Sequence, residues 1–130
     1  MLAIFLDIET NGLNPQKHHI LEIALQIHDL PSCRMLTAYA AIVRHPLTVW
    51  HQSSPESLAV NGFTLEKMQT GKPQDLVQTE TLQLFQQYQI HRKNAVFICQ
   101  NPSFDRSFFC QMIDPDLQEK LKWPYHWLDL

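Results

Sequence analysis

The chain has 130 residues, of which 45% are hydrophobic and 18% are charged, and its net charge at pH 7 is −3 with histidine taken as neutral. This length and composition predict one folded domain over residues 1–130 and exclude an intrinsically disordered chain. The small negative charge argues against a protein that binds polyanions through a broad basic surface. It does not exclude an enzyme that meets nucleic acid through bound metal and a few backbone amides.

The cysteines and the apolar runs set the expected compartment. Cys33, Cys99 and Cys110 are odd in number and have no CxxC spacing, which indicates free thiols in a cytoplasmic protein. No apolar run reaches the length that spans a membrane, and the first predicted strand begins at the initiator Met1. We therefore expect no signal peptide and no membrane partner.

Residues 2–8 form a nearly unbroken apolar run that only Asp7 interrupts, and a Thr-Asn-Gly turn follows. Such a run, bounded by turn residues, predicts a strand buried on both faces at the centre of a sheet. Side chains alternate along a strand, so Asp7 and Glu9 project from the same face, with Cα atoms roughly 7 Å apart.

Two carboxylates held this close repel each other, and burial disfavours both charged forms. A hard divalent cation removes that penalty because it binds oxygen ligands and offsets their charge. The pair Asp7 and Glu9 therefore indicates a metal site at the end of a central strand. The alternative is a strand that frays into a loop with two solvated acids.

The next part of the chain predicts two more strands and three helical segments. Alternating apolar residues indicate strands at 19–28 and 35–44, which with the first strand make an antiparallel meander. Ser54-Pro55 and Asn61-Gly62 are typical start and stop signals for a short helix over 55–60. A helical turn is expected at 64–69 and an amphipathic helix at 75–91.

A second, wholly apolar strand is predicted at 95–99, directly before a helix with Ser103 as its N-cap. Asp105 then lies in the first helical turn, where the helix dipole alone would favour an acid. The functional alternative is that Asp105 reaches the sheet edge where Asp7 and Glu9 emerge, since sites in open α/β sheets form where central strands end. Residues 125–130 are expected to begin a further strand, so the predicted α/β domain is C-terminally incomplete.

Two motifs carry a resemblance to a known family. Asp7-Ile8-Glu9-Thr10-Asn11-Gly12-Leu13 and the later Asn101-x-x-Phe104-Asp105 resemble the first two motifs of the DEDD exonucleases. This superfamily includes the proofreading epsilon subunit of DNA polymerase III, ribonuclease T and oligoribonuclease. The segment from Ser54 to Thr64 is similar to the helix and turn that these enzymes place after the third strand.

The resemblance implies a ribonuclease H-like fold and removal of nucleotides from the 3′ end of DNA or RNA with two divalent cations, Mg²⁺ or Mn²⁺. It implies that Asp7, Glu9 and Asp105 are catalytic and hold the metal ions. The implied substrate-binding residues are the strand-end turn and two positions of the second motif: Thr10, Asn11, Gly12, Leu13, Asn101 and Phe104. Backbone amides around residues 10–12 would hold the terminal nucleotide, with Leu13 against its base.

The sequence departs from the family pattern in its third motif. A general-base His or Tyr and a fourth metal-binding Asp should lie on a helix after the last strand, and nothing here fits. His126 and Asp129 have the wrong spacing and lie in the strand that should precede that helix. Gln100 stands where many relatives have His.

Two functions therefore stay open at this stage. The first is a 3′–5′ exonuclease whose C-terminal portion lies beyond residue 130. The second is a non-catalytic exonuclease-like module that binds nucleic acid or a protein partner without cutting. The expected partner is a nucleic acid 3′ end, and a homodimer and a polymerase-type partner are both left open.

Overall fold

The computed structural model describes all residues from Met1 to Leu130 and contains one six-stranded mixed sheet. The strands lie in the order β4-β3-β2-β1-β5-β6, so the first strand of the chain is central. Their bounds are β1 Leu2–Thr10, β2 Ile20–Asp29, β3 Arg34–Arg44, β4 Lys72–Pro73, β5 Ala95–Cys99 and β6 Trp127–Asp129. β1, β2 and β3 pair antiparallel, and β5 runs parallel to β1, which confirms the predicted α/β fold with its meander and parallel strands.

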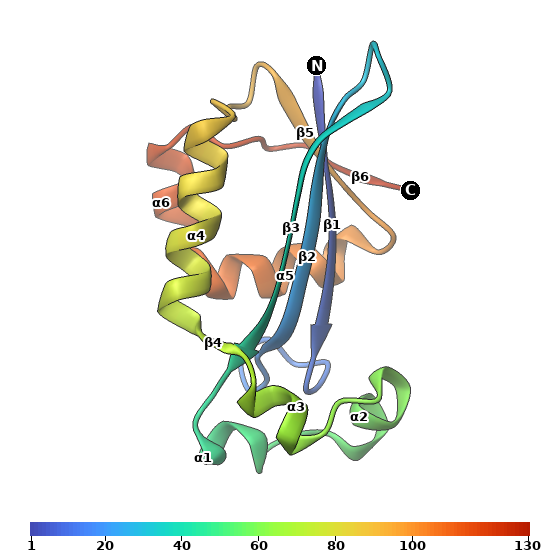
Figure 1. The fold of residues 1–130 in the computed structure, drawn as a ribbon, viewed down its shortest axis with the longest axis vertical. Coiled ribbons are helices and arrows are strands. Elements are labelled where there is room, and N and C mark those ends of the chain that lie inside the picture. The colour runs from blue at the N-terminus through green and yellow to red at the C-terminus, as the bar shows by residue number, and fades with distance from the viewer.

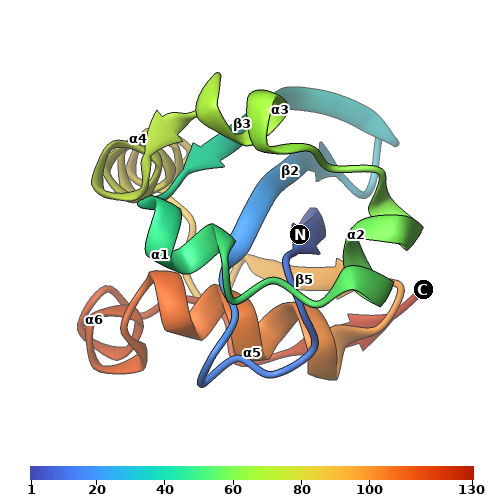
Figure 2. The same cartoon turned by 90° about the horizontal axis from the view of Figure 1, so that it is seen from below.

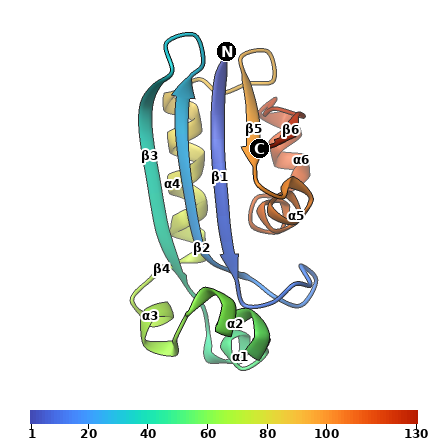
Figure 3. The ribbon, with the colours of Figure 1, turned by 90° about the vertical axis from the view of Figure 1, so that its right-hand side faces the viewer.

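The helices fall into two groups (Figure 1). Three pack against the sheet, and in Figure 3 α4 lies behind β2 and β3, while α5 and α6 lie to the right, beside β5 and β6. The other three are short and gather below the end of the sheet where β1 ends (Figure 2). The sheet-covering helices are α4 Gln74–Gln87, α5 Pro102–Met112 and α6 Pro115–Lys120, and the short ones are α1 Leu47–Trp50, α2 Pro55–Asn61 and α3 Leu65–Gln69. No helix combines the length and the apolar character that crossing a bilayer requires.

The start and stop signals read from the sequence account for α2. Ser54 is its N-cap and accepts a hydrogen bond from the backbone N–H of Ser57, while Pro55 occupies the first helical position. Gly62 ends the helix with φ of +71°, a left-handed conformation that glycine adopts without a steric penalty. The predicted helix is confirmed and extends one residue further, to Asn61.

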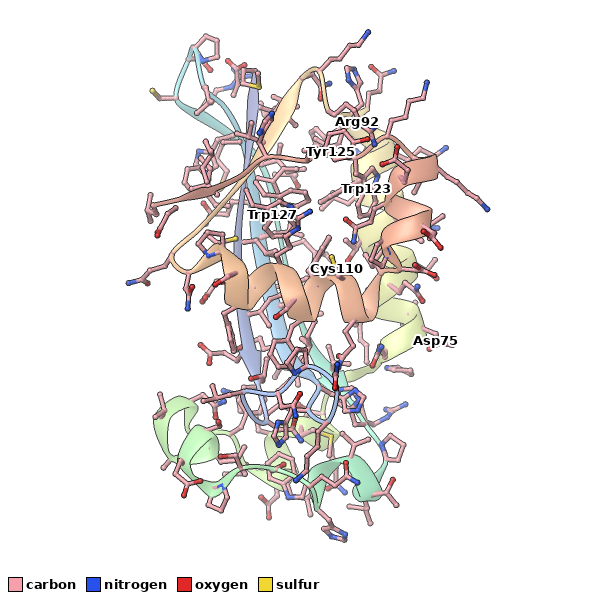
Figure 4. All side chains as sticks on the ribbon, turned by 180° about the vertical axis from the view of Figure 1, so that it is seen from behind. Asp75, Arg92, Cys110, Trp123, Tyr125 and Trp127 are labelled. Carbon is pink, nitrogen blue, oxygen red and sulfur yellow. The ribbon has the colours of Figure 1, made fainter.

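The core lies between the sheet and α4, α5 and α6. Its centre is an aromatic cluster in which Phe97 of β5 stacks on Trp127 of β6 with ring centroids 4.0 Å apart. Phe85 of α4 packs on Trp123 at 4.5 Å, and Phe109 of α5 contacts both tryptophans. Figure 4 shows Trp123 and Trp127 above α5, and Arg92 beside Tyr125. The guanidinium of Arg92 lies over the Tyr125 ring, 3.8 Å from its centroid. Aromatic burial of this kind fixes the last strand and α5 relative to each other.

Several predicted boundaries were wrong for local reasons. The helix expected at 75–91 ends at Gln87, because Gln89 adopts a left-handed φ of +52° and turns the chain back so that Ile90 bonds to Phe85. Ser103 is not the N-cap of α5, since Pro102 already opens the helix and Asn101 takes the cap position. The strand expected at 125–130 covers only Trp127–Asp129, and α1, β4 and α6 were not predicted.

The prediction that β1 is buried on both faces was also wrong. Leu6 and Ile8 face the helices and are buried, but on the other face Phe5 is half-buried and Asp7 is exposed. The cause is the placement of α4, α5 and α6 on a single face of the sheet (Figure 3). The acid in the apolar run therefore projects from the uncovered face rather than into the core.

Candidate functional site

The end of β1 carries the first two predicted site residues on one face of the sheet. Asp7 is exposed and Glu9 is half-buried, with Glu22 opposite Glu9 on β2. Burial raises the pKa of Glu9, and the nearby carboxylates of Asp7 and Glu22 raise it further, while Lys67 lowers it. Glu9 therefore sits in a negative field with one cation nearby.

Asp105 reaches the same place from the other side of β1. β5 pairs with β1 only from Leu2 to Phe5, so the last residues of β1 have no partner on that edge. The chain leaves β5, enters α5 at Pro102 and sets Asp105 in the first helical turn beside this free edge. The backbone N–H of Ile8 is close enough to the Asp105 carboxyl group to lower its pKa, and Asp105 as a residue is 4% exposed.

The surroundings of Asp105 oppose its ionisation. Its pKa is raised from 3.8 to about 6, chiefly by burial and then by Asp7 and Glu9, although the backbone N–H groups of Ile8 and of Asp105 itself act to lower it. Burial and then Asp105 and Asp7 also raise the pKa of the Cys99 thiol to about 12. These mutual effects place Asp7, Glu9 and Asp105 in one electrostatic neighbourhood.

The chemistry of this donor set fits a hard divalent cation, because every donor is a carboxylate oxygen and the excess negative charge is barely compensated. Asp7, Glu9 and Asp105 are the residues that could hold such ions. The structure nevertheless contains no group of three or more His, Cys, Asp or Glu side chains arranged to hold a metal ion. The carboxylates are neighbours here and do not form a closed ligand shell.

Asp7 and Glu9 line two separate grooves. One of about 240 Å³ runs between the end of β1, α2 and α5, and is lined by Ile8, Glu9, Thr10, Leu13, Glu56, Ser57, Val60, Asn61 and Phe104. The other, of about 650 Å³, crosses the uncovered face of the sheet and has Asp7 and Gln100 among its lining residues. We call the first the strand-end groove and the second the sheet-face groove.

The strand-end groove exposes apolar side chains that a folded chain would ordinarily bury. Leu13 is 76% exposed and Val60 is 89% exposed, and both line the groove together with Phe104. Sequence reasoning identified Leu13 and Phe104 but missed Val60 and the rest of the α2 wall. The available signal was an apolar residue just before the Asn-Gly stop of a short helix.

The residues between Glu9 and Leu13 are directed into the protein. Thr10 is 4% exposed and its hydroxyl donates to the carbonyl of Gly12 over 2.5 Å. Asn11 is fully buried, and its backbone N–H donates to the carbonyl of His19. Asn101 lies at the start of α5, where its side-chain oxygen accepts from Ser103, and it does not line the groove.

Gly12 is required by a close contact with the side chain of His18. A Cβ atom at this position would lie 2.2 Å from ring atoms of His18, which is an impossible contact. His18 is held there because its Nδ1 accepts from the backbone N–H of Asn14, and Gln111 of α5 donates to its carbonyl. Glycine is therefore needed to admit the imidazole ring, whether or not a ligand approaches.

The comparisons with known proteins agree on the fold. No family model and no curated protein matches the sequence. Among solved structures, an exonuclease I from Methylocaldum szegediense superposes with a TM-score of 0.76 at 16% identity, covering 98% of this chain and 27% of that one. Exonuclease I of E. coli, in complex with a dT13 oligonucleotide, gives a TM-score of 0.72 at 14% identity, covering 99% of this chain and 28% of that one.

A third structure is the nuclease domain of 3′hExo, a DEDDh family member bound to rAMP, with a TM-score of 0.68 at 15% identity. The match covers 95% of this chain and 62% of the 3′hExo chain. This chain has the exonuclease fold. It spans about a quarter of the length of the exonuclease I structures and under two thirds of the 3′hExo domain.

The raised pKa of Asp105 predicts a pH-dependent stability. Between about pH 4 and pH 6 the folded chain holds a proton that the unfolded chain has released, so the free energy of unfolding falls as the pH rises. In metal-free buffer, Asp105→Asn should therefore raise the free energy of unfolding by about 1–3 kcal/mol at pH 8 and by much less at pH 4. Urea denaturation at both pH values measures this, with the exposed Asp129→Asn as control. An equal gain at the two pH values would contradict the assignment.

The contact between Gly12 and His18 predicts that removing the His18 ring restores stability lost by a larger residue at position 12. Gly12→Ala should lower the free energy of unfolding by about 1–3 kcal/mol, because the new methyl group overlaps the imidazole ring. The double variant Gly12→Ala/His18→Ala should be more stable than the Gly12→Ala single variant, since the ring is gone. Chemical denaturation of both variants and of His18→Ala checks this. If Gly12→Ala has wild-type stability, the glycine serves another purpose.

Proposed function

We propose that this chain is the metal-dependent catalytic part of a 3′–5′ exonuclease that hydrolyses phosphodiester bonds at the 3′ end of DNA or RNA. The observation that carries the proposal is the electrostatic influence of Asp7 and Glu9 on the buried Asp105, at a strand end where Glu9 lines a groove with exposed apolar walls. Exonucleases of the same fold, one of them bound to an oligonucleotide and another to rAMP, support it.

Asp7, Glu9 and Asp105 would hold the divalent cations in this scheme. Bound Mg²⁺ or Mn²⁺ supplies a water nucleophile and stabilises the leaving oxygen of an in-line displacement. The protein's own contribution is positional: Asp105 stays against the N–H of Ile8, which favours its ionised form. Without metal its raised pKa disfavours that form, so protons should compete with the metal ions, and metal binding and activity should both be weaker in acid.

The strand-end groove would receive the terminal nucleotide. Leu13 and Val60 present apolar surface on which a base can pack, and the alternation of β1 brings Glu9 to the same groove. Stacking of a base on apolar and aromatic side chains does not depend strongly on its identity, which suits an enzyme that removes successive nucleotides. The nucleotides that precede the terminal one would pass Asp7 and lie along the sheet-face groove, whose lining is mostly apolar.

A second function is favoured by one observation. The three acids do not form a group arranged to hold a metal ion, and a module that binds nucleic acid without cutting it would need no such group. The same groove would then hold a 3′ terminal nucleotide with its phosphodiester bond intact. Binding without cleavage distinguishes this module from the enzyme.

Cleavage of a labelled oligonucleotide separates the two. The 130-residue chain with Mn²⁺ should shorten a 5′-labelled single strand from its 3′ end in steps of one nucleotide, though slowly, because no third-motif base or fourth metal-binding Asp lies among its residues. Asp7→Ala should reduce the rate by at least about a hundredfold, as expected when a ligand for a catalytic metal is lost. Because Asp7 is exposed, its replacement should leave the melting temperature of the apo protein nearly unchanged.

The matched control is Asp129→Ala, which removes an exposed strand acid on β6. Its cleavage rate should equal that of the wild type. Binding of the strand with no cleavage in Mn²⁺ would favour the non-catalytic module. Cleavage that persists in Asp7→Ala would refute the assignment of the site.

A further inference from the structure

Asn11 lies at the junction of three segments next to the strand-end groove. Its side chain is fully buried, although Leu13, two residues later, is 76% exposed. The side-chain oxygen accepts from the backbone N–H of His19 over 2.7 Å. The side-chain nitrogen donates to the carbonyl of Val49 and to the hydroxyl of Ser53, both over 3.1 Å. The amide therefore uses both its oxygen and its nitrogen, and it does so inside the protein.

The backbone of Asn11 continues the same network. Its N–H donates to the carbonyl of His19 over 3.1 Å, and its carbonyl accepts from the N–H of Ser54 over 2.7 Å. His19 leads into β2, Val49 belongs to α1, and Ser54 is the N-cap of α2. One residue thus joins the end of β1 to the start of β2, to α1 and to the first turn of α2.

The helix α2 depends on these bonds because little else holds it. None of its residues is buried, and among its side chains only Leu58 packs against a small apolar cluster. At the far end of the helix, Asn61 donates to the carbonyl of Thr10 over 2.8 Å. The hydrogen bonds that tie α2 to β1 are therefore at its two ends, from Ser54 to Asn11 and from Asn61 to Thr10.

This helix is the opposite wall of the strand-end groove. Glu9 and Leu13 line one side, and Ser57 and Val60 of α2 line the other. The distance between the two walls is fixed by the hydrogen bonds that the carbonyls of Thr10 and Asn11 accept from the two ends of α2. The backbone bond from Ser54 does not depend on the Asn11 side chain, but the side-chain amide holds Val49 and Ser53, in the segment that leads into α2. Loss of these side-chain bonds loosens that segment and leaves the N-terminal end of α2 less firmly placed, without touching the acids.

We propose that Asn11 is a positioning residue whose side-chain amide sets the width of the strand-end groove by fixing the segment that leads into α2 to the end of β1. It acts on the affinity for the 3′ terminal nucleotide and does not contact that nucleotide with its side chain. The inference rests on the proposed function, since it assigns the groove to a nucleotide. The inference goes beyond the proposed function because it assigns the control of nucleotide affinity to a buried side-chain amide.

The test compares Asn11→Asp with a control that loses similar bonds far from the groove. Asn11→Asp keeps the oxygen that accepts from His19 but replaces the nitrogen that donates to Val49 and Ser53. The control is Asn94→Asp in the loop before β5, where the side-chain nitrogen donates to the carbonyl of Gln89 over 2.9 Å and the oxygen accepts from His91. Both variants should lower the melting temperature.

The decisive readout is affinity, measured well below the melting temperature of each variant. The probes are 5′-fluorescein-labelled oligothymidylate DNA and oligoadenylate RNA, with fluorescence anisotropy in Ca²⁺ buffer to suppress cleavage. Asn11→Asp should weaken binding about tenfold, as expected for two lost hydrogen bonds, whereas Asn94→Asp should leave it unchanged. Where cleavage is measurable, the loss should be in KM, with kcat changed by less than about threefold.

Two further variants cover the case in which Asn11→Asp does not fold. Ser53→Ala removes a single acceptor of the amide and should weaken binding about twofold to threefold. Asn61→Ala releases the other end of α2 and should weaken binding about tenfold. In the Asn11→Asp/Asn61→Ala double variant the loss should be smaller than the product of the two single losses, because both free the same wall.

The outcomes separate the two claims. If the wild type binds neither probe, the proposed function fails and the inference fails with it. If the wild type binds the probes and Asn11→Asp and Ser53→Ala bind them as tightly as the wild type does, the amide has only a structural role. In that case the inference alone is overturned. Equal losses of affinity in Asn94→Asp and Asn11→Asp would overturn it too.

Discussion

The site depends on the offset between two parallel strands. β5 pairs with β1 over Leu2 to Phe5 and then stops, while β1 continues to Thr10. That offset leaves the N–H of Ile8 without a strand partner on one edge, and the first turn of α5 brings the Asp105 carboxyl group to it. A backbone donor that would otherwise be buried without a partner is thereby satisfied, and an acid is delivered to the end of the central strand.

The consequence is an electrostatic conflict that the protein alone does not resolve. Burial and the Asp7 carboxylate both disfavour the charged form of Asp105, and Glu9 experiences the same two effects. Structural acids seldom have such surroundings, because a neutral side chain of similar size would be more stable there. The conflict supports a site that is stable with bound cations and strained without them, which is the physical basis of the proposed nuclease.

The sequence predicts the scaffold well where the signal is local. The apolar run around Asp7, the alternation in β2 and the Ser54-Pro55 start of α2 each depend on neighbouring residues, and the structure has these elements. The position of Asp105 beside β1 follows from a strand followed at once by a helix. The exposure of Asp7 could not be predicted, because it depends on which face of the sheet the distant helices α4 and α5 cover. The roles of Asn11 and Gly12 were also beyond local patterns, since Ser53 is distant in sequence from Asn11 and the contact of Gly12 with His18 depends on how the loop between β1 and β2 folds.

The central claim is that Asp7, Glu9 and Asp105 share one electrostatic site that a divalent cation completes. The most direct measurement is a ¹³C NMR titration of the Asp105 side-chain carboxyl carbon in metal-free buffer, with and without Mg²⁺. The account predicts a midpoint near pH 6 without metal, a lower midpoint in Asp7→Asn, and a large further decrease when Mg²⁺ is added. A midpoint near the ordinary aspartate value that neither Asp7→Asn nor Mg²⁺ changes would contradict it.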